Sequence, residues 1–366
     1  MSARARLRRS AAVAFVAAVT AGSALALTAC DPETQTGAPA KPSATASKSG
    51  SPAASASASA SASTAPSATA STAAPSSAAP ATSAPAMPSA TPTKAALNGT
   101  AGNGLTISNG TRYVVMNGTV VDFGTVVRDL AWSPDGKHAA FVDGEGNLEM
   151  SAPDGSNRVM VAKAPSGVTW SHPTWQVNGA GENGYIKARN NLLFTADDHG
   201  TLTLLSAPAQ AGGVPAVLSL NPYFDDENTK PLPQTGNLWP NVGGHAGTAV
   251  YANQADGQVY IRDDYLRQQG GAVTKGSQPA LGPDEQDVVF VRSVGGHDHI
   301  FESSLREQKK VERDLTPDAA TDYTEPAVSK DGKTVAFRGQ DGVYTVPLAG
   351  GKIVKVSDTA GLPAYR

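Results

Sequence analysis

The strongest constraint on this chain is a repeated unit of short apolar runs and glycine turns that begins near Leu105. One copy comprises residues 130–136 followed by 139–142, and another comprises 326–332 followed by 335–337. Each copy has the order strand, Asp-Gly turn, strand, glycine turn, strand, glycine turn, strand. Such a four-stranded antiparallel meander is typical of the blade of a β-propeller.

Weaker copies of the same unit fill the rest of the segment, beginning at Pro173, Pro240, Pro279 and Leu362. One apolar residue of each first strand can be aligned, with separations of 43, 67, 39, 47 and 37 residues, at Trp132, Trp175, Val242, Leu281, Val328 and Tyr365. Most separations are close to the roughly 40–45 residues of a propeller blade, and the longest predicts loop insertions. We therefore expect an all-β fold that is a six-bladed β-propeller.

The chain has six first strands but only five complete meanders, so one blade lacks three strands. Three short strands at the other end of the segment, 105–107, 112–116 and 119–123, are joined by the hairpin signals Asn109-Gly110 and Asn117-Gly118. We expect the C-terminal strand, 362–365, to be the innermost strand of the blade that these N-terminal strands begin. This closure removes the free edges of a truncated sheet.

The segments 132–136 (Trp-Ser-Pro-Asp-Gly) and 329–332 (Ser-Lys-Asp-Gly) resemble the propeller repeats of the TolB family. The resemblance covers about residues 126–361 and is clearest in these two blades. It implies a binding role in the cell envelope. TolB proper carries a small α/β domain before its propeller, and a low-complexity segment occupies that place here. The motif itself predicts structure, with a tight turn at Asp135-Gly136 and Trp132 wedged between blades.

The N-terminal residues have the pattern of an export signal, with arginines among residues 1–10, an apolar run over 11–26 and small residues after it. The segment Leu27-Thr28-Ala29-Cys30 resembles the lipobox of bacterial lipoproteins, in which the cysteine is diacylated and becomes the new amino terminus. The resemblance implies a signal peptide over 1–29 and a lipid anchor at Cys30, at the extracytoplasmic face of the cytoplasmic membrane. Cys30 is the only cysteine, which excludes a disulfide within one molecule. The sequence is compatible with export by the general secretory pathway and by the twin-arginine pathway.

Residues 30–103 form a tether that consists almost entirely of Ala, Ser, Thr, Pro and Gly after its first few residues. Such side chains bury too little apolar area to offset the entropy of ordering them, so we expect this segment to be disordered. With about 70 residues, its root-mean-square span is about 45–50 Å. The predicted organisation is therefore a signal peptide (1–29), a lipidated tether (30–103) and a propeller (104–366).

The charge of the propeller segment limits its partners. Residues 101–366 contain 22 basic and 30 acidic residues, a net charge of −8. A domain this acidic has a poor surface for nucleic acid, so we expect no nucleic-acid partner. We expect a monomer whose partner is an envelope protein, a peptide or a glycan.

Propeller geometry distributes the loops over two faces. The turns between the second and third strands of each blade share one face with the connections between blades, and we name it the connection face. Polar residues gather in these loops, which predicts a ligand-binding face. Its expected residues are Asp143, Asp197, Asp198, His199, Asp225, Asp226, Glu227, His297, Asp298, His299, Asp322 and Tyr323.

Two functions from different classes fit the sequence. The first is a non-catalytic binding module without cofactor or metal, since the sequence has no nucleophile elbow, His-Glu-x-x-His motif or phosphate-binding glycine loop. The second is a metal-dependent propeller enzyme, such as a polysaccharide lyase, with ligands among His172, His199, His245, His297 and His299. Convergence of at least three of these histidines near the axis would favour the enzyme. We favour binding, because we expect the channel-lining strands to supply few acids or histidines.

Overall fold

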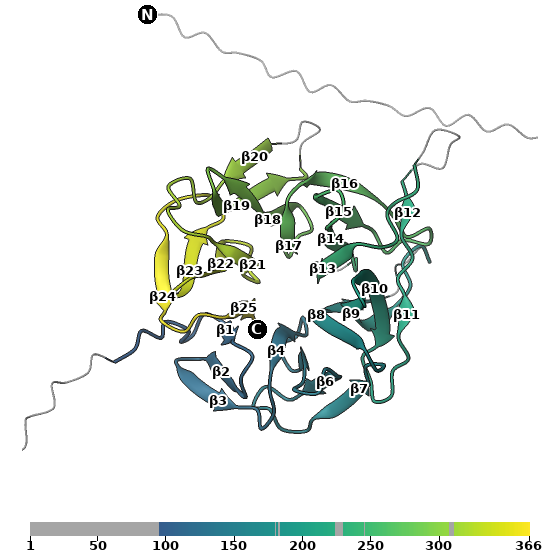
Figure 1. Ribbon diagram of the computed structural model, residues 1–366, viewed down its shortest axis with the longest axis horizontal. Coiled ribbons are helices and arrows are strands. Elements are labelled where there is room, and N and C mark those ends of the chain that lie inside the picture. Colours follow the sequence, from purple (N-terminus) through teal and green to yellow (C-terminus); the bar gives the residue numbers. More distant parts are fainter. Residues whose placement is uncertain (1–94, 180, 182–183, 224–229, 245, 307–310) are drawn as a thin grey trace, which may run out of the picture. The chain divides into compact units, whose positions relative to one another are not determined.

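The computed structural model describes residues 95–366, apart from 180, 182–183, 224–229, 245 and 307–310. The regular elements in this part of the chain are strands, which form six sheets. Figure 1 shows the sheets arranged as blades around a central axis. Within the same residues, the structure has no helix with the length and apolar character needed to span a bilayer. The predicted six-bladed, all-β propeller is confirmed.

The two blades with the clearest repeats have the expected meander. Their Ser-x-Asp-Gly turns are alike: Gly136 N donates to Ser133 O, and Gly332 N donates to Ser329 O, both at 2.8 Å. Both glycines have a φ of 68°, which a residue without a Cβ adopts without steric cost. Blade 2 comprises β4 (Arg128–Trp132), β5 (Ala139–Val142), β6 (Leu148–Ser151) and β7 (Val159–Ala162), and blade 6 comprises β21 (Thr324–Val328), β22 (Thr334–Gly339), β23 (Gly342–Pro347) and β24 (Val354–Ser357).

The weaker repeats form blades 3, 4 and 5. Blade 3 comprises β8 (Val168–Asn178), β9 (Arg189–Asp198), β10 (Thr201–Pro208) and β11 (Ala216–Val217). Blade 4 comprises β13 (Asn237–Val242), β14 (Ala249–Asn253), β15 (Gln258–Arg262) and β16 (Gln269–Lys275), with β12 (Asn221–Pro222) added as a parallel fifth strand. Blade 5 comprises β17 (Ser277–Leu281), β18 (Asp287–Val294), β19 (His297–Ser304) and β20 (Val311–Asp314).

The long separation between the repeats of blades 3 and 4 has a structural cause. The inserted segment contributes β12, and its residues Leu218 and Leu220 are buried beside Leu204 and Tyr251. The insertion therefore adds core between two blades instead of extending only as a surface loop.

Blade 1 joins the N-terminal and C-terminal strands. It has the order β25 (Leu362–Tyr365), β1 (Leu105–Ser108), β2 (Tyr113–Met116) and β3 (Thr119–Asp122). Leu105 lies opposite Tyr365 in an antiparallel ladder that ends with Ser108 opposite Leu362. The predicted closure, in which the last strand is innermost in a blade of N-terminal strands, is confirmed.

The hydrophobic core is divided among the interfaces between neighbouring blades. Each of six clusters of buried side chains has members from two adjacent blades. The second strand of every blade contributes one large side chain that packs against the preceding blade: Ile107, Phe141, Phe194, Tyr251, Phe290 and Phe337. Burying such a side chain contributes about 2–3 kcal/mol, so the stability of the ring is spread over all of its interfaces.

Residues that precede the predicted boundary at 104 cover the outer edge of blade 6. Asn98 forms an isolated bridge with Ser357, and Gly99 N donates to Val356 O at 2.7 Å. Thr100 is fully buried, and its hydroxyl accepts from Gly118 N at 2.9 Å. The described end of the tether is therefore packed on the propeller, where it covers an edge strand that would otherwise expose unpaired backbone groups.

Candidate functional site in the central channel

The innermost strands of five blades share an irregularity at the same place. In β4, β8, β13, β17 and β21, the pairing register with the second strand shifts, as it does at a β-bulge. A residue other than glycine lies at each shift with a φ between 48° and 55°: Asp129, His172, Trp239, Gln278 and Glu325. Such residues seldom adopt this backbone conformation. Five equivalent instances indicate a feature built into the repeat.

The bulges place these side chains on the wall of the central channel. A cavity of about 380 Å³ is lined by residues of all six innermost strands, including the five bulge residues. Leu362 has the equivalent position in β25, which pairs regularly with β1. We name the six residues the channel ring: Asp129, His172, Trp239, Gln278, Glu325 and Leu362. Because each innermost strand starts where a blade connection ends, the channel ring lies toward the connection face.

A proline follows the channel-ring residue in five blades, at Pro173, Pro240, Pro279, Pro326 and Pro363. Proline has no N–H group and is tolerated only where a strand needs no partner on that side. The inner edge of an innermost strand borders the channel and meets this condition. The proline therefore marks, in the sequence, the position next to the channel ring.

Channel side chains also join neighbouring blades through the backbone. Asp129 Oδ2 accepts a hydrogen bond from His172 N at 3.0 Å, and Gln278 Oε1 accepts one from Glu325 N at 2.7 Å. In both cases, the side chain of one blade satisfies the bulged backbone of the next. These hydrogen bonds fix the side chains of Asp129 and Gln278 in place before any ligand arrives.

His172 and Trp239 form the aromatic part of the channel wall. Their ring centroids are 3.9 Å apart with an interplanar angle of 30°, and Trp239 Nε1 donates to His172 Nε2 at 3.2 Å. An indole N–H is only a donor, so His172 Nε2 must be unprotonated and the proton of the neutral ring is on Nδ1. Burial lowers the pKa of His172, and the nearby Asp129 carboxylate opposes this effect. The imidazole is therefore neutral at pH 7.

Asp129 and Glu325 supply negative charge to the channel ring. Burial raises the pKa of Glu325, the Arg338 guanidinium lowers it, and repulsion from Asp129 raises it further. Arg338 Nη1 lies 3.3 and 3.4 Å from the two carboxylate oxygens of Glu325. The side chain of Asp129 is 24% exposed, and its Oδ2 lies 3.9 Å from His172 Nδ1. The Asp129 carboxylate is therefore close enough to raise the pKa of Glu325.

The other end of the channel has a different chemistry. Lys330 lines the cavity there with Pro134, Gly244 and Pro283. Its Nζ donates to Pro134 O at 2.8 Å, which ties blade 6 to blade 2 across the inner strand of blade 1. The channel is therefore acidic and aromatic toward the connection face, and prolines and one tethered ammonium line its opposite end.

Three residues of the predicted ligand-binding face lie on the long hairpin of blade 3. Asp198 lies opposite Val168, at the start of the innermost strand that leads to His172. Asp198 and His199 are exposed, with Asp198 Oδ1 2.6 Å from His199 Nδ1. Asp197 accepts from Gly200 N at 2.6 Å and closes the turn.

A second exposed group lies where blade 5 connects to blade 6. Asp322 Oδ1 accepts from Asp298 N at 3.0 Å and lies 3.5 Å from His297 Nδ1. Asp298 is also hydrogen-bonded to Ser293 Oγ. Asp322 precedes the channel-ring residue Glu325 by three residues. This exposed group therefore lies on the segment that enters the channel.

Other members of the predicted face have structural roles. Asp143 is buried and accepts from the backbone N–H groups of Glu145 and Asn147, closing its own turn. His299 is buried, with Nδ1 2.8 Å from Asp314 Oδ2. Tyr323 is buried in the core beside Phe337 and Tyr344, because its ring fills the interface between blades 5 and 6. Asp225, Asp226, Glu227 and His245 lie outside the described residues, as does Cys30.

The histidines named as metal ligands do not converge in the described part of the chain. His172 lies in the channel, His199 and His297 lie on loops of different blades, and His299 lies within a strand. Among the residues that the structure describes, no three His, Cys, Asp or Glu side chains are close enough together to hold a metal ion.

The channel ring was not predicted from the sequence. We expected few acids or histidines on the channel-lining strands, yet Asp129, His172 and Glu325 all line the cavity. A regular strand alternates its side chains between two faces, and the bulge breaks that alternation. The available signal was the residue directly before the recurring proline, which marks every channel-ring residue except Asp129.

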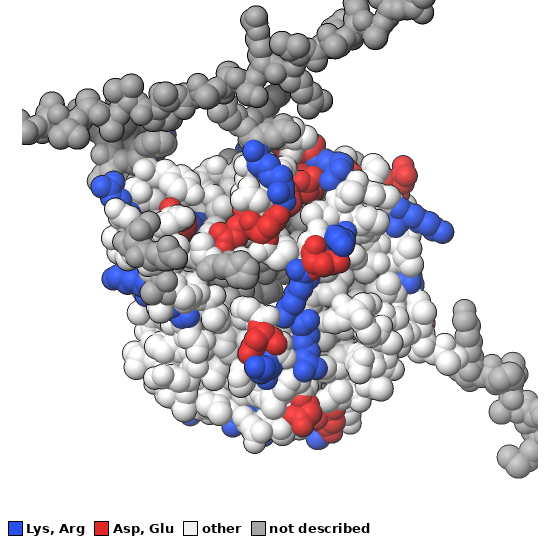
Figure 2. Space-filling view, turned by 180° about the vertical axis from the view of Figure 1, so that it is seen from behind, with Lys and Arg blue, Asp and Glu red and all other residues white. Residues whose placement is uncertain are grey.

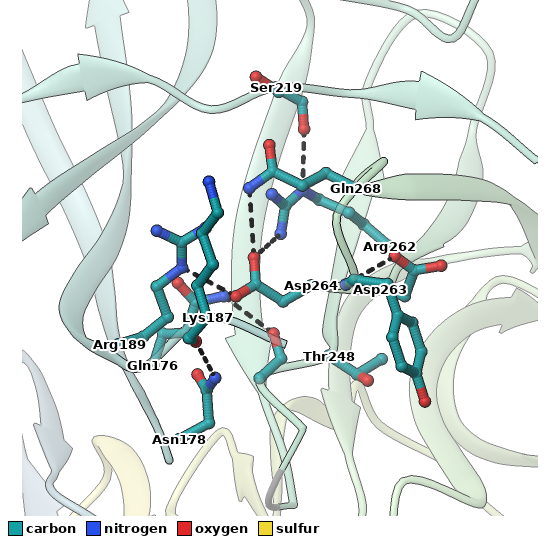
Figure 3. A network of polar contacts seen from close by, with 12 residues as sticks. Gln176, Asn178, Lys187, Arg189, Ser219, Thr248, Arg262, Asp263, Asp264 and Gln268 are labelled. Carbon is teal, nitrogen blue, oxygen red and sulfur yellow. Dashed lines mark hydrogen bonds and ion pairs between the residues drawn. The ribbon is translucent and has the colours of Figure 1, made fainter. Parts of the chain in front are cut away.

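A buried polar network lies between blades 3 and 4, outside the channel. Figure 3 shows Asp264 between Arg189 and Arg262, at 2.9 and 3.3 Å from their nitrogen atoms. The Arg262 side chain is 1% exposed, and its Nε donates to Ser219 O at 2.8 Å. The Gln268 amide lies 3.0 Å from both guanidinium groups in the orientation that lets its carbonyl accept from them. Because its groups bond one another and the backbone, this network is a structural clasp between blades.

Figure 2 shows one face of the molecule, on which basic and acidic side chains are interspersed between broad uncharged areas. That face has no large patch of a single sign among the residues shown in colour.

Comparisons with known proteins agree with this architecture. No protein-family model matches the sequence, and a search of curated proteins finds no match. Among solved structures, a putative TolB from Agrobacterium tumefaciens aligns with 70% of this chain and 89% of its own, at 19% identity and a TM-score of 0.50. TolB from Acinetobacter baumannii aligns over 71% of this chain and 65% of its own, at 14% identity and a TM-score of 0.52. The chain therefore has a TolB-like six-bladed β-propeller fold.

Proposed function

We propose that this protein is an extracytoplasmic lipoprotein whose propeller binds an envelope protein, peptide or glycan through the channel mouth on the connection face. The observation that carries this proposal is the channel ring, which five blades build at some conformational cost. Positive φ in a residue with a side chain costs about 1 kcal/mol or more. Backbone strain of this kind is concentrated at functional sites.

The channel also has the composition of a binding site. Ligand sites are concave, largely apolar and carry a few convergent polar groups. Here, prolines, aromatic rings and aliphatic side chains together make up most of the wall, and Asp129, His172, Gln278 and Glu325 are among its polar groups. The exposed groups around Asp198 and Asp322 lie on segments that lead into the same mouth, so they extend the proposed surface outward.

Binding fits the chemistry of His172 better than catalysis does. Its Nε2 lone pair already accepts the Trp239 N–H, so the ring has no free base on that side. A general base needs an accessible lone pair within reach of the proton that it removes. The geometry therefore supports a recognition site more than a hydrolytic one.

The proposed location follows from the N-terminal sequence. Diacylated Cys30 would hold the chain at the extracytoplasmic face of the cytoplasmic membrane, and two acyl chains are enough for stable anchoring. The tether would then let the propeller reach partners at some distance from the bilayer.

Site-specific photo-crosslinking in cells tests the channel as the binding site. A photoreactive p-benzoylphenylalanine in place of Leu362 places the probe in the channel ring, and the same group in place of Val120 places it on an outer strand as the control. We expect a discrete envelope adduct from position 362 that is absent at 120 and that disappears when Trp239→Ala is added. Identical adducts from both positions, or none from 362, would overturn the proposal.

A further inference from the structure

We propose that the channel ring selects a ligand with a cationic group, an ammonium or guanidinium, which binds between Asp129 and Glu325. This inference rests on the proposed function, because it specifies the chemistry of the ligand that the channel would accept. It follows from the placement of the two carboxylates, their shortage of counter-charge and the aromatic wall that faces them.

The two carboxylates lie on the same side of the channel ring. Asp129 comes from β4 and Glu325 from β21, and the strand between them in the ring is β25. β25 contributes Leu362 at the equivalent position, which supplies no counter-charge. A group inserted here would therefore have a carboxylate on each side and an apolar side chain between them.

The cations of the protein balance only part of this charge. Arg338 pairs with Glu325, and its side chain is 47% exposed. In the described residues, the ion-pair partner of Asp129 is His172, which is neutral while it accepts from Trp239. Arg128 precedes Asp129 but turns away, since its Nη2 donates to Asp143 O at 3.4 Å. One carboxylate in a partly buried site is thus left without a formal positive charge.

This imbalance favours a cationic ligand. The interaction of two charges is several times stronger in a partly buried site than in bulk water. Repulsion from Asp129 contributes to the raised pKa of Glu325, so a bound cation would relieve an existing unfavourable interaction. Hydrogen bonds to charged carboxylates are also stronger than those between neutral groups.

The opposite wall suits the remainder of such a ligand. Trp239 lies three blades away from Leu362 around the ring, and its indole is held flat against His172. An aromatic face attracts cations and packs against the aliphatic stem of lysine or arginine. The ammonium of Lys330, which could have attracted an anion, is tied to the carbonyl of Pro134 at the far end.

Binding of capped tripeptides to the full-length chain tests the inference directly. The probes are acetyl-Ala-X-Ala-amide, in which X is arginine, lysine, citrulline or glutamate, and a fifth probe is Ala-Ala-Ala-amide with a free amino terminus. Citrulline matches arginine in shape but is neutral. Isothermal titration calorimetry measures each affinity, and tryptophan fluorescence reports contact with the channel wall.

We expect at least one cationic probe to bind at least tenfold more tightly than the citrulline and glutamate probes, and this preference to weaken as salt is added. The arms with arginine, lysine and the free amino terminus identify which cation is preferred. Asp129→Asn combined with Glu325→Gln should abolish the preference, and Asp154→Asn, on an exposed turn of blade 2, should leave it unchanged. The amide introduced by Asp129→Asn would retain an oxygen that accepts from His172 N, so the blade contact can be preserved.

Three outcomes would overturn the inference: no measurable binding of any cationic probe, no cationic probe that binds more tightly than the citrulline probe, or an unchanged preference in the double variant. Circular dichroism verifies that the double variant is folded. If it is not, the same affinities are measured on each single variant, Asp129→Asn and Glu325→Gln. The crosslinking experiment separates this result from the proposed function. An adduct from position 362 that persists in the double variant would retain the channel as a binding site and remove only the charge selectivity.

Discussion

Trp239 holds His172 in its neutral form, because the indole N–H donates to Nε2 at 3.2 Å and an imidazolium would have no lone pair to accept it. Burial acts in the same direction and lowers the pKa of His172 below the ordinary 6.5. The two residues come from neighbouring blades, 3 and 4, so the ionisation of one side chain is linked to how these blades pack.

This relationship makes the stability of the fold depend on pH. Between the lowered pKa of the folded chain and 6.5, the unfolded chain binds the His172 proton and the folded chain does not. Stability should therefore fall as the pH decreases through this window, by at most about 1.4 kcal/mol per pH unit for one proton. Urea unfolding at pH 7.5 and 5.5 should show a smaller pH dependence for His172→Asn than for the wild type. His199→Asn, at an exposed site, should behave as the wild type does.

Removing the indole donor should release the histidine. In Trp239→Phe the ring remains but the N–H is lost, so protonation of Nε2 no longer breaks a hydrogen bond. We expect the pKa of His172 to rise toward its ordinary value, and stability at pH 7 to fall by about 1 kcal/mol. The imidazole proton shifts in an NMR titration measure the pKa. An unchanged titration midpoint would show that burial alone keeps His172 neutral.

The closing blade should be sensitive to loss of its core. Ile107 is 1% exposed and packs between blades 1 and 6. Ile107→Ala should lower the free energy of unfolding by about 3 kcal/mol, through lost burial and the cavity left behind. Val120→Ala, in the same sheet but 60% exposed, should change it by less than about 0.5 kcal/mol. Similar losses in chemical denaturation of the two variants would contradict the described packing of blade 1.

The clasp between blades 3 and 4 should depend on its single central carboxylate. Asp264→Asn leaves Arg189 and Arg262 with no carboxylate between them, and Arg262 is fully buried. Breaking a buried ion pair on one side costs about 3–5 kcal/mol, because the remaining charge stays desolvated. Thermal unfolding followed by circular dichroism should show a large drop in midpoint. Asp154→Asn serves as the control, since its carboxylate contacts only its own exposed turn.

The proposed lipid anchor can be tested independently of the propeller. Cys30→Ala removes the only thiol of the chain, so diacylation cannot occur. We expect the variant to move from the membrane fraction to the soluble extracytoplasmic fraction, with the propeller still folded. Metabolic labelling with a radioactive fatty acid should mark the wild type alone. Retention of the variant in the membrane would show that another feature attaches the chain.

The sequence was sufficient to predict the ring and its closure because both depend on local signals. Asn109-Gly110 and Asn117-Gly118 specify hairpins regardless of the rest of the fold, and counting strands then assigns Leu362–Tyr365 to the incomplete blade. The Asp-Gly turns and the recurring apolar runs repeat with blade spacing. Such features can be recognised in the sequence without knowledge of the three-dimensional structure.

The candidate site was less predictable because it depends on departures from regularity. Nothing about Glu325 or His172 as residue types indicates a positive φ, and each would be assigned to an ordinary strand. Arg262 could not be predicted as buried, because the carbonyl that accepts from its Nε belongs to Ser219, 43 residues away in the chain. Asp143 and Tyr323 were assigned to the surface from their polar character, whereas the first closes its own turn and the second fills the core.

The pairing of Leu105 with Tyr365 also sets the order of events during synthesis. The strand that completes blade 1 follows all the other strands of the ring along the chain, so a growing chain can stack its other blades while the first remains open. Contacts across so many residues form slowly, since a long loop must close before they contribute. The channel ring obtains its sixth member only at that step. Ligand binding at the proposed site would therefore require that the final strand of the ring has been made and has paired with β1.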